Sequence, residues 1–398
     1  MKIIFVYENI VTGGVYSLLL RFCKSLTKHN IESTVVCKKI DKKCKEAFIN
    51  NNISFTLLRS YRQYDFKTLL NNDSNLLITF EASSYIECVS LFFKNDNTKV
   101  LLYSVHPYTF DYFRIISKYK ILKMIFYNKY IEFFNNEFEN SHFIFMDEDT
   151  IIYSLNSVGR ECHSEKLEDY ILRLIVLNDD IVAGRKEAFT NRGKSILTVT
   201  RADFPFKGYI KGLLEIFSNL KRKNEDLKLT IITSGYHVDH IKKWAGDMKD
   251  VLIIDSIAYD KLHNYYKNAN LYIGMGTTIL EASINGSISI PVLPYTYDCK
   301  ADCLFAEKPK WLVSQADNNS NALSLIDKVL MLNANQRKEI IDNTIDEISC
   351  IYGEDEIIEK LLYFEKRASV NKRCNIVLLT YVRLKKIIKL IKGICREE

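Results

Sequence analysis

The residues best suited to chemistry lie in the stretch Leu271–Val292, which reads LYIGMGTTILEASINGSISIPV. The pattern predicts a strand, a tight turn at Gly274 and Gly276, a helix and a second strand. A glycine turn that leads into a helix N-terminus exposes backbone N–H groups at the positive end of the helix dipole, which suits a phosphate. Glu281 lies about one turn inside the helix, where its carboxylate suits a ribose diol. The stretch therefore predicts a nucleotide site, and we expect Thr277 or Thr278 to cap its helix.

A pair of basic residues follows another predicted strand, in the segment SILTVTRADFPFKG (Ser195–Gly208). Arg201 comes just after the strand, and Lys207 with Gly208 opens the next predicted helix. Two cations at the carboxyl end of a strand, beside a helix N-terminus, would neutralise a diphosphate. The alternative is a pair of solvated surface charges. We favour the diphosphate because the glycine turn should lie in the same cleft.

Two further candidates follow apolar strands in the first half of the chain. Gly13 and Gly14 precede a predicted helix and would let a ligand approach the backbone, although an ordinary tight turn is the alternative. His106 ends the apolar run LLYSVH and precedes Pro107, so we expect it at a strand's carboxyl end. There it could hydrogen-bond a sugar hydroxyl, whereas the alternative is a structural histidine. The first strand carries no GxGxxG fingerprint, so a dinucleotide site is not predicted.

Length and composition indicate a soluble globular protein. The chain has 398 residues, which suffices for about two domains, with 47% hydrophobic and 26% charged residues. It contains no apolar run long enough to span a membrane, and its start does not resemble a signal peptide. The ten cysteines form no framework, so we expect a reduced cytoplasmic protein. Cys299 and Cys303 lack a second pair of ligands, so no structural zinc is predicted.

Alternating strand and helix patterns predict two parallel sheets covered by helices, an α/β architecture of two doubly wound Rossmann-like domains that face a cleft. The polar segment Asn178–Lys194 marks the predicted junction. We assign residues 1–185 to an N-terminal acceptor domain, 186–365 to a C-terminal donor domain and 366–398 to a basic tail. The predicted strands are Ile3–Tyr7, Ser33–Lys38, Ile53–Leu58, Leu76–Phe80, Val100–Val105, Phe143–Met146, Ser195–Thr200, Lys228–Thr233, Val251–Asp255, Leu271–Ile273 and Ser289–Val292.

The tail carries the basic character of the protein. From Lys366 onward there are ten Lys or Arg and two Glu, a balance of +8, whereas the whole chain is at +6. The rest is slightly acidic, so no nucleic-acid-binding surface is predicted. Apolar and basic residues of Ile376–Ile394 fall on two helical faces, which is typical of a helix on an anionic membrane surface. The alternative is a terminal helix packed on the protein. The predicted membrane residues are Lys385, Lys386, Ile387, Lys389, Ile391 and Lys392. A second lysine-rich, aromatic segment, Ile115–Phe134, also suits an interface.

In order and spacing these residues resemble the group 1 glycosyltransferases, which have the two-domain glycosyltransferase-B fold. Lys28–Val36 (KHNIESTVV) is similar to the family's GHEVTVVT, with Asn30 where glycine is usual. Thr200–Ile232 resembles the family's pattern around GRL, KG and LIEAF, and Asp260–Val292 resembles the pattern around EGFG and LEA. The resemblance covers most of both domains and is more specific in the second.

The resemblance implies a nucleotide-sugar donor, a glycan or lipid-linked acceptor, transfer with retention, and no metal or other cofactor. Arg201 and Lys207 would hold the diphosphate and stabilise the departing nucleotide, and Glu281 would hold the ribose. Gly14 would contact the donor phosphates, and His106 the transferred sugar. The implied catalytic residues are Arg201, Lys207 and His106, and the implied donor-binding residues are Gly13, Gly14, Gly274, Met275, Gly276, Thr277, Thr278 and Glu281.

One position departs from the family pattern. The family has two acids eight positions apart, and the first would fall at Ile273, which cannot accept a hydrogen bond. Donor recognition would then rely on backbone N–H groups from Met275 to Thr278.

We expect a bacterial-type enzyme on the inner face of the membrane that transfers a sugar from a UDP- or GDP-linked donor to a lipopolysaccharide, O-antigen or capsule intermediate. One alternative is a sugar-nucleotide epimerase, which would need paired carboxylates; Glu8, Glu81 and Asp111 are its candidates. The other is a non-catalytic scaffold, which Ile273 favours.

Overall fold

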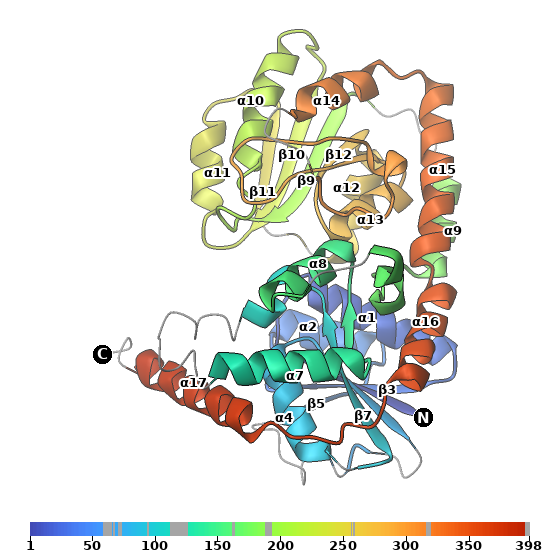
Figure 1. The fold of residues 1–398 in the computed structure, drawn as a ribbon. Coiled ribbons are helices and arrows are strands. Elements are labelled where there is room, and N and C mark those ends of the chain that lie inside the picture. The colour runs from blue at the N-terminus through green and yellow to red at the C-terminus, as the bar shows by residue number, and fades with distance from the viewer. Residues whose placement is uncertain are drawn as a thin grey trace. The chain divides into compact units, whose positions relative to one another are not determined.

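The computed structural model describes the chain outside residues 59–65, 67, 71–73, 94, 112–125, 161–163, 188–192, 256, 258, 316–319 and 395–398. The first part of the lysine-rich segment predicted at Ile115–Phe134 lies outside the described residues. The chain forms two compact units (Figure 1). Unit 1 comprises Met1–Ile175 and Glu354–Glu398, and unit 2 comprises Val176–Gly353.

Unit 1 is built on a parallel sheet of strands in the order β5-β3-β1-β6-β7-β8. The strands are β1 (Lys2–Val6), β3 (Glu32–Cys37), β5 (Phe55–Leu57), β6 (Asn75–Thr79), β7 (Thr98–Ser104) and β8 (Phe143–Phe145). A small parallel pair joins β2 (Asn9–Ile10) to β4 (Lys39–Ile40). Ile3 to Val6 are fully buried because helices cover both faces of a parallel sheet.

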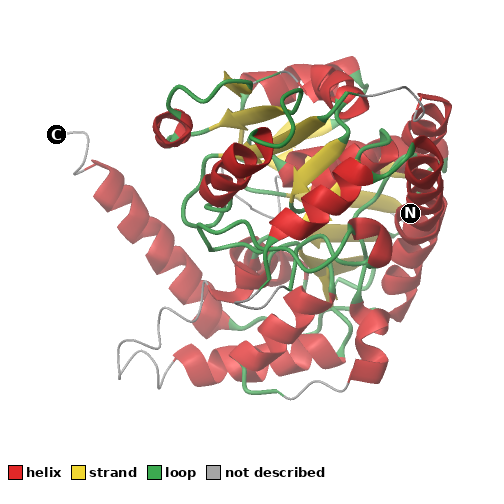
Figure 2. Cartoon of the chain, turned by 90° about the horizontal axis from the view of Figure 1, so that it is seen from above, coloured by secondary structure: helices red, strands yellow, loops and turns green. Residues whose placement is uncertain are grey.

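The helices of unit 1 come from both ends of the chain. They are α1 (Gly14–Lys28), α2 (Lys42–Asn50), α4 (Ala82–Phe92), α7 (Asn128–Glu139), α8 (Glu148–Ser157), α16 (Glu354–Arg367) and α17 (Ile376–Ile394), with the short 3₁₀ helices η1 (Pro107–Phe110) and η4 (Ser164–Tyr170). The C-terminal helix α17 packs against α4 and α7, and its Leu378 and Val382 belong to the core of unit 1. Figure 2 shows α17 leading to the C-terminal end of the chain.

Unit 2 contains a second parallel sheet, in the order β11-β10-β9-β12-β13. Its strands are β9 (Ser195–Arg201), β10 (Lys228–Ser234), β11 (Val251–Asp255), β12 (Leu271–Gly274) and β13 (Ile288–Pro291). Its helices are α9 (Asn178–Glu187), α10 (Ile210–Lys221), α11 (Val238–Ala245), α12 (Tyr259–Asn268), α13 (Thr277–Ile284), α14 (Ala322–Met331) and α15 (Ala334–Tyr352), with the 3₁₀ helix η5 (Phe305–Glu307). The predicted fold of two doubly wound domains is confirmed.

The division of the chain differs from the predicted boundaries of 1–185, 186–365 and 366–398. The units divide at Val176, because the polar segment predicted as the junction contains α9, which belongs to unit 2. A Cβ on Gly184 would lie 1.8 Å from the Ile284 carbonyl oxygen, so α9 packs directly on the end of α13. The chain returns to unit 1 at Glu354, where Lys28 pairs with Glu354 at 3.0 Å.

The segment after α16 is fastened to unit 1 by a buried polar network. The Asn371 side-chain oxygen accepts from the Val100 N–H at 2.8 Å, and the Ser369 carbonyl lies 2.8 Å from His142 Nε2. His142 Nδ1 in turn lies 2.6 Å from Glu137 Oε2. These buried partners fix the path of the chain between α16 and α17.

Candidate functional site

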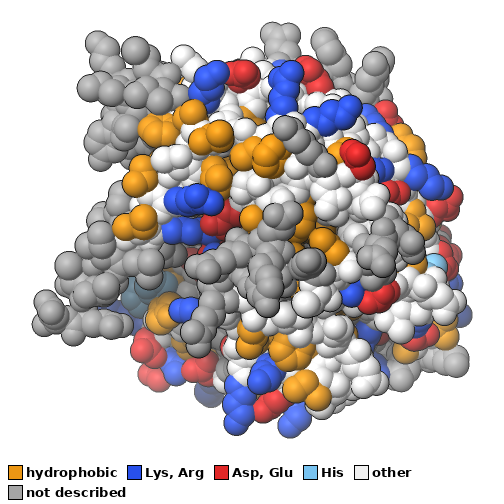
Figure 3. Space-filling model, turned by 90° about the horizontal axis from the view of Figure 1, so that it is seen from below, with side chains coloured by type: hydrophobic (Ala, Val, Ile, Leu, Met, Phe, Trp, Pro, Cys, Tyr) orange, Lys and Arg blue, Asp and Glu red, His pale blue; other side chains and the backbone are white. Residues whose placement is uncertain are grey.

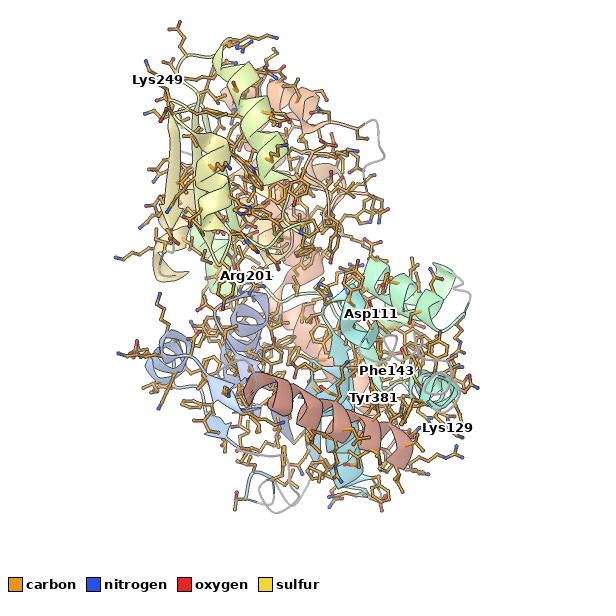
Figure 4. The ribbon with its side chains drawn as sticks, turned by 90° about the vertical axis from the view of Figure 1, so that its left-hand side faces the viewer. Asp111, Lys129, Phe143, Arg201, Lys249 and Tyr381 are labelled. Atoms are coloured by element: carbon orange, nitrogen blue, oxygen red, sulfur yellow. The ribbon has the colours of Figure 1, made fainter. Side chains whose placement is uncertain are left out.

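The predicted donor residues gather at the carboxyl edge of the unit 2 sheet. The sheet order is β11-β10-β9-β12-β13, so the chain runs outward from β9 to β10 and β11 on one side and from β12 to β13 on the other. The strand order therefore reverses between β9 and β12. Open α/β sheets bind ligands at such a switch point, outside the carboxyl ends of the strands. Arg201 ends β9 and Gly274 ends β12, so both flank this point. Figure 4 labels Arg201 at this edge, whereas Lys249 precedes β11 at the amino edge.

Arg201 and Lys207 form a pair of cations on the loop between β9 and α10. Burial, together with the nearby charge of Arg201, lowers the pKa of Lys207 to about 7. The Lys207 ammonium lies 4.6 Å from the centre of the Phe206 ring, and Arg201 is exposed. Within the part of the chain that the structure describes, neither side chain forms an ion pair. Such a pair suits a bound anion, which would relieve the repulsion between the two cations.

Two glycines set the position of this loop. A Cβ on Gly208 would lie 2.6 Å from the Thr296 carbonyl oxygen, and one on Gly212 would lie 2.3 Å from the Cys299 nitrogen. The start of α10 therefore packs closely on the segment Thr296–Cys299, and Lys207 lies directly before it. No local sequence pattern predicts this contact, because it joins positions almost ninety residues apart.

The glycine turn after β12 forms as predicted, but its helix is capped differently. Gly276 has a φ of 73°, which favours glycine, and is itself the N-cap of α13. The prediction that Thr277 or Thr278 caps the helix is wrong, because both lie inside α13; the Thr278 hydroxyl donates to the Met275 carbonyl at 3.1 Å. The Gly276 N–H donates to the Leu312 carbonyl at 2.8 Å and is therefore not available to a phosphate. The first-turn amides of Thr277 and Thr278 have no acceptor within the helix.

Glu281 is already held in place. Its side chain is 6% exposed, and the Tyr266 hydroxyl donates to Glu281 Oε2 at 3.1 Å. Sequence analysis did not predict Tyr266 as a site residue. The only signal for a buried ring at this position was the pair of adjacent tyrosines in α12. Ile273 is 0% exposed and pairs with Ile290 in the sheet, so its side chain belongs to the apolar core. That position presents no polar atom to a donor.

The candidates of unit 1 lie at the carboxyl edge of its own sheet. Gly13 is the N-cap of α1, and a Cβ on Gly14 would meet no atom within 4 Å, so packing does not demand glycine there. His106 is exposed two residues beyond β7, and its Nδ1 accepts from the Tyr108 N–H at 3.1 Å. That contact fixes the ring and leaves Nε2 as the nitrogen that faces away from the backbone contact.

A charged cluster lies at the switch point of unit 1, between β1 and β6. The Glu8 N–H donates to Glu81 Oε2 at 3.3 Å, and Lys38 lies 2.7 Å from Glu8 Oε1. Lys386 of α17 lies 2.7 Å from Glu87 and 3.4 Å from Glu8. Burial alone would raise the pKa of Glu8, but the two ammonium groups bring it below its ordinary value, whereas burial and the charge of Glu8 raise the pKa of Glu81.

This cluster bears on the carboxylate pair that an epimerase would need. Glu8 and Glu81 are neighbours, but Glu8 is engaged by lysines. Asp111, labelled in Figure 4, accepts from the Tyr153 hydroxyl at 3.4 Å instead of joining the pair. Sequence analysis missed Lys38 as a member of the cluster. Among the described residues, no group of three or more His, Cys, Asp or Glu could hold a metal ion.

No family model matches the sequence, and no curated protein matches it. Solved structures do match. A glycosyltransferase from Rickettsia africae ESF-5 has a TM-score of 0.60 and 15% identity, and the match covers 92% of this chain and 98% of that one. A variant of S. aureus TarM in complex with fondaparinux, alpha-GlcNAc-glycerol and UDP has a TM-score of 0.63 and 12% identity, covering 91% and 99%. Anabaena HepE in complex with UDP-glucose has a TM-score of 0.60 and 12% identity, covering 92% and 99%.

These matches span nearly the whole of each chain, including both units. The chain has the glycosyltransferase-B fold, as its resemblance to the group 1 family led us to expect. At identities of 12% to 15% the likeness shows the fold, and function must be argued from the site.

Proposed function

We propose that this chain is a glycosyltransferase that moves a sugar, with retention, from a UDP- or GDP-linked donor to a surface-glycan acceptor such as a lipopolysaccharide, O-antigen or capsule intermediate. The observation that carries the proposal is the pair Arg201 and Lys207 at the switch point of unit 2. Neither forms an ion pair among the described residues, and the first turn of α13 follows the neighbouring strand. The complexes of TarM with UDP and of HepE with UDP-glucose favour a UDP-linked donor.

In this proposal the chain's own residues supply the charge that the reaction needs. Arg201 and Lys207 bind the diphosphate and stabilise the negative charge that develops as the glycosidic bond breaks. Glu281, oriented by Tyr266, accepts hydrogen bonds from the ribose. As the resemblance implies, His106 contacts the transferred sugar, and the backbone at Gly13 and Gly14 contacts the donor phosphates. With two cations and a helix N-terminus at the phosphates, no metal is required.

Recognition of the donor sugar falls to the backbone after β12. Because Ile273 is buried, the amides of Met275, Thr277 and Thr278 are the donors that remain on this turn, while that of Gly276 is used by Leu312. The turn contacts the donor sugar through these backbone N–H groups, which donate hydrogen bonds to its hydroxyl oxygens.

Nucleotide binding tests the proposal. Calorimetry with UDP, GDP and ADP should show one nucleotide bound in the micromolar range, about −8 kcal/mol, and Lys207→Ala should weaken it by at least about tenfold. Lys211→Ala is the matched control, because Lys211 is an exposed lysine of the following helix whose partner is Glu215. If none of the three nucleotides binds, the chain is better explained as a scaffold.

We also propose that α17 lies on the anionic inner surface of the membrane and brings the enzyme to a lipid-linked acceptor. Leu384 and Ile387 are 49% and 52% exposed although both are apolar, and Arg383 beside them is exposed. Lys386 is engaged by Glu87, and Lys385 lies 5.8 Å from the centre of the Tyr381 ring, which Figure 4 labels. The side chains of Lys389, Ile391 and Lys392 lie outside the described residues.

The proposal rests on α17 rather than on a broad patch, since the face seen from below mixes basic, acidic and hydrophobic side chains (Figure 3). No helix among the described residues is long and apolar enough to cross a membrane. Association would therefore be interfacial, through one amphipathic helix.

Sedimentation with lipid vesicles tests the role of α17. The full chain should bind vesicles that contain phosphatidylglycerol and release from them in high salt, because the attraction is partly electrostatic. The double change Leu384→Glu and Ile387→Glu should weaken binding by at least about tenfold, because it removes apolar burial and adds negative charge. Met331→Glu, at an exposed apolar residue of unit 2, is the control. Equal binding by all three proteins would exclude α17 as the contact.

A further inference from the structure

An aromatic surface on unit 2 has no role in the function proposed above. Six rings form it, from three segments that are far apart in the sequence: the loop after β9, the helix α11 and the loop after β13. We call it the aromatic strip, and its members are Phe204, Phe206, His240, Trp244, Tyr295 and Tyr297.

The two loops place their rings in matched pairs. Phe204 lies 6.4 Å from Tyr297, and Phe206 lies 4.9 Å from Tyr295, as measured between ring centres. The Tyr295 N–H donates to the Phe206 carbonyl at 3.1 Å, which ties the loops together at the second pair. Pro205 separates the first loop's rings and Thr296 the second's, so the aromatic residues alternate along both segments.

Helix α11 extends the strip. Trp244 lies 4.8 Å from Phe204 and 6.0 Å from Tyr297, measured between ring centres. The His240 ring is nearly parallel to that of Phe204, with an interplanar angle of 13° at 6.2 Å. His237, one turn earlier on the chain, lies 5.4 Å from His240 and adds a second exposed imidazole.

Half of the strip's members are exposed to solvent. Tyr295 and Tyr297 are 46% and 45% exposed, and His240 is exposed, while Phe204 and Trp244 are half-buried beneath them. Tyr295 has a φ of 60°, a conformation that bulky side chains rarely adopt. Strained residues that keep a side chain exposed are typical of binding sites.

The strip begins at the proposed donor site. Lys207 lies against the Phe206 ring at 4.6 Å, and Phe204 and Phe206 belong to the loop that also carries Arg201. A molecule lying along the strip would therefore have one end beside the cations that bind the diphosphate.

We propose that the aromatic strip is a carbohydrate subsite that holds successive sugar rings of the glycan on which the enzyme acts. The proposal rests on the proposed glycosyltransferase function and extends it: the acceptor or product is a chain of several sugars, not a single sugar. The apolar C–H face of a pyranose stacks on an aromatic ring, and His237 and His240 hydrogen-bond the hydroxyls at its edge.

The position of the strip favours a glycan as its occupant. The strip begins on the loop that carries the proposed diphosphate-binding cations, beside Lys207, so the sugar substrate of a glycosyltransferase is the molecule that would lie along it. The rings can stack on the apolar faces of sugar rings, and the imidazoles beside them can hydrogen-bond the hydroxyls.

Tryptophan fluorescence provides the test in the full chain. The sequence has two tryptophans, so Trp311→Phe leaves Trp244 as the sole reporter. We would titrate this protein with disaccharides and linear hexasaccharides of glucose, N-acetylglucosamine and mannose. At least one hexasaccharide should change the Trp244 emission and bind about tenfold more tightly than its disaccharide, because it covers more rings.

Two variants tie the binding to the strip. Tyr297→Ala and His240→Ala should each weaken hexasaccharide binding by about tenfold, and because both side chains are exposed, neither change should prevent folding. Tyr363→Ala, at an exposed tyrosine of α16 in unit 1, should leave binding unchanged. UDP binding should stay within twofold of wild type in all three variants.

The outcomes are distinct. If no hexasaccharide alters the Trp244 emission, or if binding survives both strip variants, the subsite is excluded. If instead UDP shifts the emission and Tyr297→Ala weakens UDP binding, the strip stacks the nucleobase and the proposal is wrong. If the protein binds a hexasaccharide but not UDP, the proposed donor specificity is rejected and the carbohydrate subsite is retained.

Discussion

Donor affinity is expected to fall steeply as the pH rises above about 7, by up to about tenfold per pH unit. The cause is the Lys207 ammonium, whose pKa burial and the charge of Arg201 lower to about 7. A bound diphosphate stabilises the charged form and raises this pKa, so binding takes up a proton wherever free Lys207 is neutral. Below pH 7 the free protein is already protonated and the affinity should be level. Above pH 7 Lys207 must take up a proton from solvent when the donor binds, and the affinity falls until the pH reaches the pKa of Lys207 in the complex.

Calorimetry with UDP-glucose between about pH 6 and pH 9 would measure this effect, because its diphosphate does not titrate in that range. At about pH 8, buffers of different ionisation enthalpy should reveal uptake of nearly one proton on binding. Lys207→Arg is the matched control, since a guanidinium stays charged throughout and its affinity should not change with pH. A level wild-type profile with no proton uptake would contradict this expectation, because a Lys207 with a pKa of about 7 that binds the phosphates must take up a proton.

Replacing Gly184 by valine is expected to destabilise unit 2 by about 3 kcal/mol. Even the first added carbon would lie 1.8 Å from the Ile284 carbonyl oxygen, far inside contact distance. Both sides of the contact are backbone, one in α9 and the other at the end of α13, so the clash can be relieved only by moving a helix. Because α13 also carries Glu281, the movement should weaken nucleotide binding as well.

Thermal unfolding of the wild type and of Gly184→Val tests this expectation, and the midpoint should be lower by roughly 6–12 °C in the variant. Ala183→Val, at the neighbouring exposed position of the same helix, is the control and should cost only the helix propensity of valine, about 0.6 kcal/mol. Equal stability of the two variants would show that the close approach of α9 to α13 is absent in solution.

The sheets could be predicted from sequence because parallel strands are buried on both faces. Their apolar runs, bounded by glycine or polar residues, predicted every strand of the two large sheets. For Val251–Asp255 the predicted first and last residues are those of β11. The short strands β2 and β4, two residues each, carry too little pattern to detect. The glycine turns also followed from local chemistry, since the positive φ at Gly276 favours glycine.

The remaining features depend on contacts that no local pattern encodes. Glu281 was identified, but its partner Tyr266 requires α12 and α13 to pack together. The contact of Lys386 with Glu87 joins positions 299 residues apart. In the same way, the amphipathic pattern of α16 shows that it has a buried face and does not show which unit buries it. The predicted boundary near residue 365 was misplaced for that reason.

The path of the chain also orders events during synthesis. Unit 2 is inserted between the two parts of unit 1, and its ends meet where the Val176 N–H donates to the Tyr352 carbonyl at 2.8 Å. Leu378 and Val382, which belong to the core of unit 1, are synthesised after the whole of unit 2. Unit 2 can therefore close while unit 1, begun first, still lacks α16 and α17 and exposes the apolar surface that they cover. If translation stopped soon after Gly353, the released chain would contain the whole of unit 2 and an incomplete unit 1.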